Sequence, residues 1–257
     1  MKKRSVLMKK ILYFLSLTFL LAQDSEEKNV WAVTYMKPKP DNVAQFEKGL
    51  ADHVAKHHPA DGWSEYHFQV VSGPNLGMYI KFSGPHSWKS FDERVRSQAD
   101  VDHSRRNIRP HLDLDQSYRS SEYWVYSKEL SYNPAMWTFA HLSYNYTTPG
   151  SGSDYIEFLE GFKKAKTIAE SEQSHEIYKI VSGSNPDTWV WAYPMEKMED
   201  MSSTASLGGG GEFLQDALGK AEADRINDIY QKVTKSRMRQ VIKFRPELST
   251  SIGNDEN

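Results

Sequence analysis

The sequence predicts an α+β fold made of two tandem modules, because the chain carries an internal repeat and both halves show the same order of elements. Residues Val70 to Asn75 read VVSGPN, and residues Ile180 to Asn185 read IVSGSN. The repeat has a period of roughly 110 residues. We therefore expect a first module over residues 29–133 and a second module over residues 134–249.

Matches elsewhere in the chain support the repeat. Phe46 and Gly49 in FEKGL correspond to Phe158 and Gly161 in FLEGF, and Trp31 corresponds to the tryptophan of MWTFAHL in the second half. The offset between matched positions grows along the modules. The insertions are therefore expected in loops.

Each element of the first module follows from a local pattern. Asp41 is suited to cap a helix in which Val43, Phe46, Leu50 and Val54 recur at helical spacing. Alternating strands on either side of a Gly-Pro-Asn-Leu-Gly turn predict a hairpin. The predicted elements are strand Val30–Met36, the helix from Asp41, strands Glu65–Ser72 and Met78–Ser83, a second helix from Trp88 to about Pro110, and strand Ser121–Leu130.

The second module repeats this order. Its predicted elements are strand Met136–Ser143, helix Tyr155–Ile168, strands Glu176–Ser182 and Thr188–Tyr193, a helix over about Phe213–Val233, and strand Arg237–Phe244. The order βαββαβ is that of the split-βαβ, ferredoxin-like unit. Such a unit has helices on one face of its sheet, and the other face needs a cover. Two units in one chain can cover each other.

The duplicated βαββαβ order with aromatic sheet faces resembles the dimeric α+β barrel superfamily. That superfamily includes antibiotic-biosynthesis-type monooxygenases, NIPSNAP-like proteins, and haem-degrading and chlorite-dismutase-like enzymes. The resemblance covers essentially the whole mature chain and is one of element order, without a motif match. It implies two ferredoxin-like modules that form an intrachain pseudo-dimeric α+β barrel, and it implies no particular activity.

The repeat also predicts which side chains face the barrel lumen. Tyr79 and Lys81 align with Trp189 and Trp191, whereas the alternating positions between them are apolar and suit a helix-packed core. The same comparison on the other strands gives a lumen rich in aromatic rings with a few polar groups. The candidate ligand-binding residues are Tyr35, His67, Gln69, Tyr79, Lys81, His141, Lys179, Trp189 and Trp191.

Three functions are compatible with such a lumen. An apolar cavity with few polar groups is typical of a small-molecule site, so the leading hypothesis is binding of a small hydrophobic or aromatic ligand. The first alternative, implied by the resemblance, is a monooxygenase-like enzyme, either haem-dependent or cofactor-free. In the cofactor-free form the substrate itself would donate an electron to oxygen, with His67, His141 or Tyr35 as general base. The second is a structural or interaction protein whose aromatic side chains fill the barrel. The sequence identifies no catalytic set and no cofactor.

The chain contains nine histidines, which are candidate ligands of a metal or a haem. His53 and His57 share one face of the first helix, but the sequence supplies no third ligand, so no metal site is predicted. His103 lies where haem-using members of the superfamily often carry their proximal ligand, but its flanking residues are strongly polar. An exposed side chain is therefore the expectation for His103.

Composition and the chain ends set the remaining expectations. Residues 1–22 resemble a signal peptide, with basic residues before the apolar run Ile11 to Leu21, so we expect export to a periplasmic or extracellular location and no stable membrane span after cleavage. Cysteine is absent, which excludes disulfides and thiolate ligands. The formal net charge of -2 disfavours nucleic acid as a partner.

Three further expectations concern assembly and flexible segments. The chain could form a homo-oligomer. The glycine run Gly208 to Gly211 is a candidate for part of a mobile lid, and residues 250–257 are expected to be a flexible tail.

Overall fold

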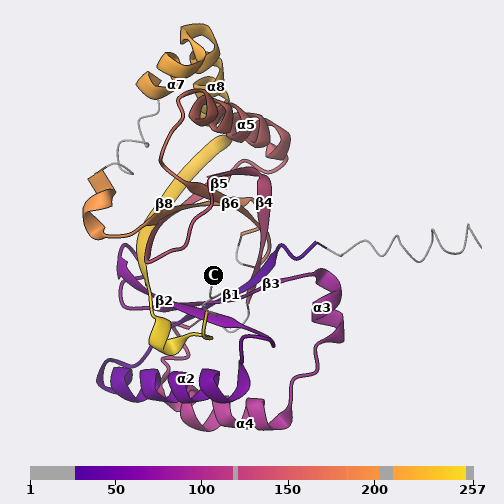
Figure 1. Ribbon diagram of the computed structural model, residues 1–257, viewed down its shortest axis with the longest axis vertical. Helices are drawn as coiled ribbons and strands as arrows, with labels where there is room; N and C mark the ends of the chain where they lie inside the picture. Colours follow the sequence, from indigo (N-terminus) through magenta and orange to yellow (C-terminus); the bar gives the residue numbers. More distant parts are fainter. Residues whose placement is uncertain (1–26, 118–120, 184, 203–210, 253–257) are drawn as a thin grey trace, which may run out of the picture.

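Eight strands form one closed antiparallel barrel in the computed structural model, which describes residues 27–117, 121–183, 185–202 and 211–252. The expected signal peptide, residues 208–210 of the glycine run and residues 253–257 of the expected tail lie outside the described residues. Around the barrel the strands follow the order β1-β3-β2-β8-β5-β7-β6-β4 (Figure 1). Their bounds are β1 Val30–Met36, β2 Glu65–Ser72, β3 Tyr79–His86, β4 Glu122–Tyr132, β5 Phe139–Thr147, β6 His175–Ser182, β7 Thr188–Met195 and β8 Thr234–Phe244.

The predicted arrangement as two tandem ferredoxin-like modules is wrong. Strand β4 pairs with β1 on one side and with β6 on the other, and β8 pairs with both β2 and β5. Backbone hydrogen bonds therefore run continuously between the two halves of the chain, and no separate sheet remains. Closure satisfies the backbone groups that two open sheets would leave unpaired at their edges. An assembly through free sheet edges, as a structural role would require, has no basis among the described strands.

Helices cover two opposite sides of the barrel (Figure 1). One side carries α2 (Val43–His57) and α4 (Gln98–Asn107), and the other carries α5 (Gly152–Ile168), α7 (Gly211–Leu218) and α8 (Lys220–Val233). The short α3 (Trp88–Glu93) lies beside the first pair.

Local signals explain where these helices begin and end. The helix expected from Trp88 is divided into α3 and α4. Ser97 is the N-cap of α4, and its side chain accepts a hydrogen bond from Asp100 N at 3.2 Å. The expected helix over Phe213–Val233 is divided at Gly219, whose φ of +80° favours glycine. Asp41 is not a cap, because it lies within a 3-10 turn that precedes α2.

The barrel interior is a continuous apolar core with side chains from all eight strands. It includes Val33, Phe68, Ile80, Trp124, Leu142, Tyr178, Val190 and Ile242. Because successive side chains of a strand point to opposite faces, the neighbours of these residues point outward.

The faces predicted for β3 and β7 are therefore reversed. Tyr79 packs against Phe46 of α2, with ring centroids 5.0 Å apart, while Trp189 and Trp191 belong to the core beneath α5. Aromatic rings pack as well beneath a helix as inside a barrel, and some of them also find a polar partner there. Trp191 Nε1, for example, donates to Tyr155 Oη of α5 at 3.0 Å.

No helix among the described residues is long and apolar enough to cross a membrane.

Replacing Gly49 with alanine should destabilise the fold by separating α2 from α4. A Cβ at this position would lie 2.0 Å from the Asn107 backbone oxygen, so the helices must move apart at a cost of about 1–3 kcal/mol. Gly152→Ala is the matched control, because a Cβ there meets nothing within 4 Å. Urea unfolding followed by circular dichroism compares the two free energies. Equal stability of both variants would contradict the close approach.

Candidate functional site

One mouth of the barrel contains a cavity of about 270 Å³. It lies where β1, β2 and β6 begin and where β3 and β8 end. Aromatic and aliphatic side chains form most of its wall. The lining residues are Trp31, Tyr66, Phe68, Phe82, Pro85, Ala135, Met136, Trp137, Glu176, Tyr178, Phe244 and Ile252.

Glu176 is the one ionisable carboxyl group among these lining residues, and its side chain is held in place by two of them. The hydroxyl of Tyr178 donates to Glu176 Oε2 at 2.6 Å, and Trp137 Nε1 donates to Oε1 at 2.8 Å. Glu176 is only 8 % exposed. Burial raises the pKa of this carboxyl above its ordinary value of 4.5, although the hydrogen bonds from Tyr178 and Trp137 oppose the rise. A carboxyl in such surroundings is suited to accept and return a proton.

Beyond the cavity, buried side chains occupy the described part of the lumen. Trp124 is fully buried at its centre, and the far part of the lumen carries a polar group of side chains. Tyr35 Oη and Tyr144 Oη lie 2.8 Å apart, and Gln240 Nε2 donates to Tyr144 Oη at 2.9 Å. The expected cavity is therefore found at one mouth of the barrel, and the expected packing of aromatic side chains is found beyond it. Tyr35 faces the lumen as predicted but does not line the cavity.

The predicted ligand-binding residues of β2 and β3 lie outside the barrel, on the side covered by α2. Gln69 Oε1 accepts from Arg245 Nη1 at 3.1 Å, and Tyr79 donates to Glu47. Lys81 forms an ion pair of 2.8 Å with Glu65. His67 is fully buried, and burial lowers its pKa to about 3. Tyr79 thus contacts α2, and none of these four side chains lines the cavity.

The predicted residues of β5, β6 and β7 also point outward. His141 stacks on Tyr193 with ring centroids 5.9 Å apart, and burial lowers its pKa to about 4. Lys179 Nζ lies 5.0 Å from the ring centroid of Trp189. Neither His67 nor His141 borders the cavity, so neither is positioned to be the general base of a reaction there.

The sequence contained a signal for Glu176 that the face assignment obscured. Glu176, Tyr178 and Ile180 alternate along β6, and the last two belong to the barrel core. A carboxyl on the apolar face of a strand is uncommon and marks a functional candidate. The face that carries Glu176 was predicted to pack against a helix, so Glu176 is not among the predicted site residues.

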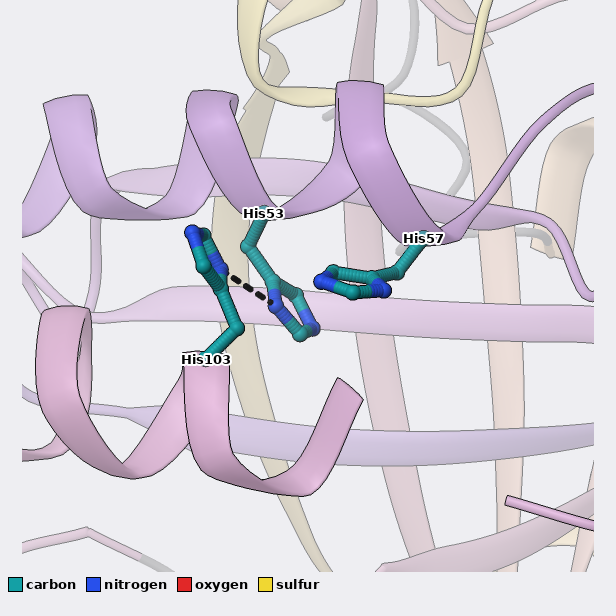
Figure 2. A group of neighbouring side chains, drawn as sticks. All are labelled: His53, His57 and His103. Carbon is teal, nitrogen blue, oxygen red and sulfur yellow. Dashed lines mark hydrogen bonds between the residues drawn. The ribbon is translucent and has the colours of Figure 1, made fainter. Parts of the chain in front are cut away.

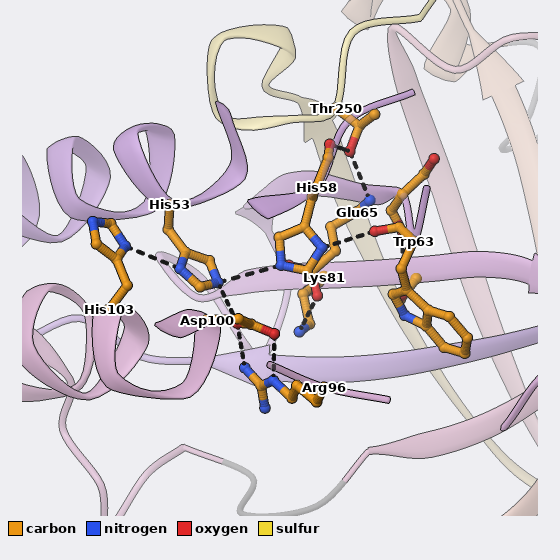
Figure 3. A network of polar contacts seen from close by, with 11 residues as sticks. His53, His58, Trp63, Glu65, Lys81, Arg96, Asp100, His103 and Thr250 are labelled. Atoms are coloured by element: carbon orange, nitrogen blue, oxygen red, sulfur yellow. Dashed lines mark hydrogen bonds and ion pairs between the residues drawn. The ribbon is translucent and has the colours of Figure 1, made fainter. Parts of the chain in front are cut away.

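A second group of polar side chains lies between α2, α4 and the outer face of β2 (Figure 3). His58 Nδ1 donates to the Trp63 carbonyl at 2.8 Å, and His53 Nε2 lies 3.3 Å from Asp100 Oδ1. Burial lowers the pKa of His53 to about 4. Burial alone would raise the pKa of Glu65, but the positive charge of Lys81 reverses the effect and brings it to about 2.

The cavity does not fit a haem. Histidine and cysteine thiolate, the commonest axial ligands of a haem iron, do not line the cavity, and the hydroxyl of its Tyr178 is engaged by Glu176. His103, the sequence candidate for that role, is on α4, where its Nδ1 lies 3.1 Å from His53 Nδ1. A volume of about 270 Å³ is also at the small end of ligand pockets, which begin near 300 Å³.

Comparisons with known proteins support the fold. No family model matches the sequence, and no curated protein sequence matches it. Among solved structures, a candidate monooxygenase from Lactobacillus acidophilus NCFM aligns with a TM-score of 0.55 at 11 % identity, over 88 % of this chain and 98 % of that one. An anthrone oxidase-like protein aligns with a TM-score of 0.55 at 10 % identity, over 86 % and 92 %. A candidate chlorite dismutase aligns with a TM-score of 0.51 at 10 % identity, over 86 % and 96 %.

These similarities show that the chain has the fold of the dimeric α+β barrel proteins. They do not confirm the tandem duplication. At such low identity the activity is not carried over with the fold.

Replacing Lys81 with methionine should act on stability and not on the cavity. Glu65 is 3 % exposed on its side chain and would be left as a buried charge without its ion-pair partner. Breaking a buried pair in this way costs about 3–5 kcal/mol. Denaturant unfolding at pH 7 measures the loss, and the double variant Lys81→Met with Glu65→Gln should recover most of it. Full stability of Lys81→Met alone would show that the pair is not needed.

Glu176 makes folding less favourable as the pH rises. Its pKa is higher in the folded protein than in the unfolded chain, so the folded state binds more protons and stability falls as the pH rises from below 4.5 through the folded pKa. Glu176→Gln removes this pH dependence, so the stability of the variant relative to the parent protein should increase as the pH rises over that range. Chemical unfolding from pH 4 to pH 8 tests the difference. Glu160→Gln, at an exposed position of α5, should show no such trend.

Proposed function

We propose that this protein is a cofactor-free, monooxygenase-like enzyme that oxidises a small aromatic substrate in the barrel-mouth cavity, with Glu176 as the general base. The observation that carries the proposal is the Glu176 carboxyl, which is buried in an aromatic cavity with a raised pKa. The fold similarity to monooxygenase-like proteins supports the same class of reaction. Binding of a small molecule without chemistry is the competing function.

The cavity suits a flat, largely apolar substrate. The aromatic rings of Trp31, Phe68 and Phe82 provide faces and edges for stacking. Polar contacts are concentrated at one place, where Glu176 lies beside Tyr178 and Trp137. A substrate would therefore be oriented with its single acidic position toward Glu176. Phenols and benzylic ketones of two or three rings have this character.

The reaction needs no reductant other than the substrate. Glu176 takes a proton from an activated CH₂ group, and the resulting carbanion transfers one electron to O₂. The substrate radical and superoxide combine to form a C–O bond, and the proton on Glu176 returns to give a hydroperoxide. Loss of water from this hydroperoxide leaves a ketone. One O₂ is consumed, one oxygen atom enters the product and the other leaves as water, so atoms and electrons balance.

Glu176→Gln should bind the substrate and fail to turn it over. Anthrone is a suitable first probe, because its CH₂ group is acidic and its rings are flat. We expect the parent protein to consume one O₂ per anthrone above the uncatalysed rate, and the variant to lose about 10²- to 10⁴-fold in kcat. Quenching of tryptophan fluorescence by anthrone under nitrogen measures binding separately from turnover.

The outcomes separate the candidate functions. Full activity of Glu176→Gln would remove Glu176 from the reaction. Binding without turnover by the parent protein would favour the small-molecule-binding function, and the absence of both would reject the cavity as a site for this substrate class. Glu160→Gln serves as the control for the loss of a carboxylate elsewhere.

We also propose that the mature protein is exported. The basic residues and apolar run of the first 22 residues support this proposal. Expression of the full chain in an exporting host, followed by N-terminal sequencing of the product, tests it. An uncleaved N-terminus in the cytoplasm would contradict export.

A further inference from the structure

Three histidines converge between α2 and α4, away from the cavity (Figure 2). His53 and His57 lie one turn apart on the same face of α2, and His103 reaches toward them from α4. Their ring centroids are 5.1 to 5.3 Å apart in all three pairs. The third ligand that the sequence did not supply for His53 and His57 is thus provided by a helix about fifty residues further along the chain.

The distance between two of the ring nitrogens matches the distance between two ligand atoms bound to the same metal ion. His53 Nδ1 and His103 Nδ1 are 3.1 Å apart. Two nitrogens bound to a tetrahedral Zn²⁺ at 2.0–2.1 Å lie about 3.3 Å from each other. One nitrogen of each histidine lies within 4.8 Å of the other two. A small rotation of the His57 ring would bring its nitrogen to the same separation.

His57 has a nitrogen available for this purpose. Its Nε2 is buried and has no hydrogen-bond partner among the described residues. A buried polar atom without a partner is costly and calls for an explanation. A bound cation would satisfy it, and His57 and His103 are both partly exposed, so an ion can reach the group from the surface of the helix pair.

The residues behind His53 orient it as a ligand. When His53 binds through Nδ1, its proton is on Nε2, which forms a hydrogen bond of 3.3 Å with His58 Nε2 and lies 3.3 Å from Asp100 Oδ1. Asp100 is fixed in turn by Arg96, whose Nε and Nη2 donate to its two oxygens at 2.8 and 3.1 Å (Figure 3). A ligating histidine whose second N–H faces a hydrogen-bond acceptor and a nearby carboxylate is held in the orientation that outer-sphere partners give in metal sites.

We propose that His53, His57 and His103 bind a divalent transition-metal ion. Three imidazoles without a thiolate or a ligating carboxylate favour Zn²⁺, Cu²⁺ or Ni²⁺ over Mg²⁺ and Ca²⁺. The ion would join the C-terminal half of α2 to α4 and leave one coordination position for water. None of the cavity-lining residues belongs to the group, so the proposal is independent of the proposed oxidation.

A second group, His53 with His58 and Asp100, shares one residue with this set. It is the weaker candidate, because all three of its residues are buried and both Asp100 oxygens already accept from Arg96. His58 therefore provides a discriminating variant.

The test uses the full mature chain without a histidine tag, stripped with EDTA and titrated with ZnCl₂ by calorimetry. We expect one Zn²⁺ per chain and a higher Tm in its presence. His57→Ala and His103→Ala should abolish high-affinity binding, and Asp100→Asn should weaken it about 10- to 100-fold. His58→Gln and His111→Ala, which change histidines outside the set, should retain binding.

Two further readouts keep the test decisive. Co²⁺ in place of Zn²⁺ should give the intense visible absorption of tetrahedral coordination, which unspecific surface binding does not give. Unfolding curves recorded in EDTA show whether a variant that fails to bind is still folded. The proposal is overturned if the parent protein binds no Zn²⁺, if folded His57→Ala and His103→Ala bind as tightly as the parent, or if binding is lost with His58→Gln and kept with His57→Ala.

Discussion

Closure of the barrel is the constraint on which the other features depend. Because β4 and β8 each pair with strands of both halves, every side chain of the sheet faces either one shared lumen or one of the outer faces. The lumen then has a fixed volume, which rings such as Trp124 fill at its centre. The core does not extend over the mouth, where strands begin and end and the cavity lies. The cavity is therefore a consequence of closure, and its aromatic wall is the continuation of the core.

Two buried carboxyls on this barrel have opposite protonation behaviour, and their surroundings explain it. Glu65 is on the outer face of β2, where Lys81 lies 2.8 Å away, and its pKa falls to about 2. Glu176 is at the mouth, where its partners are the neutral donors Tyr178 and Trp137, and its pKa rises. The same residue type is thus held as an anion at Glu65 and made readier to bind a proton at Glu176. Differences in surroundings of this kind let one residue type serve a structural role in one place and a chemical role in another.

The sequence predicts the strands and most helices closely, because these depend on local patterns. The hairpin around the turn at Gly73 to Gly77 is confirmed by the pairing of β2 with β3. Which face of a strand is internal could not be obtained in this way, since polar and aromatic side chains are buried both beneath the helices and inside the barrel. Trp191 and Lys81 illustrate the point, as each finds its partner on the outer face. The assignment of Glu176 depended on the same unresolved choice.

The histidine group depends on a contact that no local pattern reveals. His103 reaches His53 because α2 and α4 cross closely at Gly49, where a Cβ would meet the Asn107 backbone. The same region is linked to the cavity through the end of the chain. Thr250 Oγ1 donates to the His58 carbonyl at 2.9 Å, and Thr250 N donates to Glu65 O at 2.8 Å. Ile252, two residues later, lines the cavity. Residues that follow the last strand therefore form part of the mouth because β2 and the residue that ends α2 hold them there.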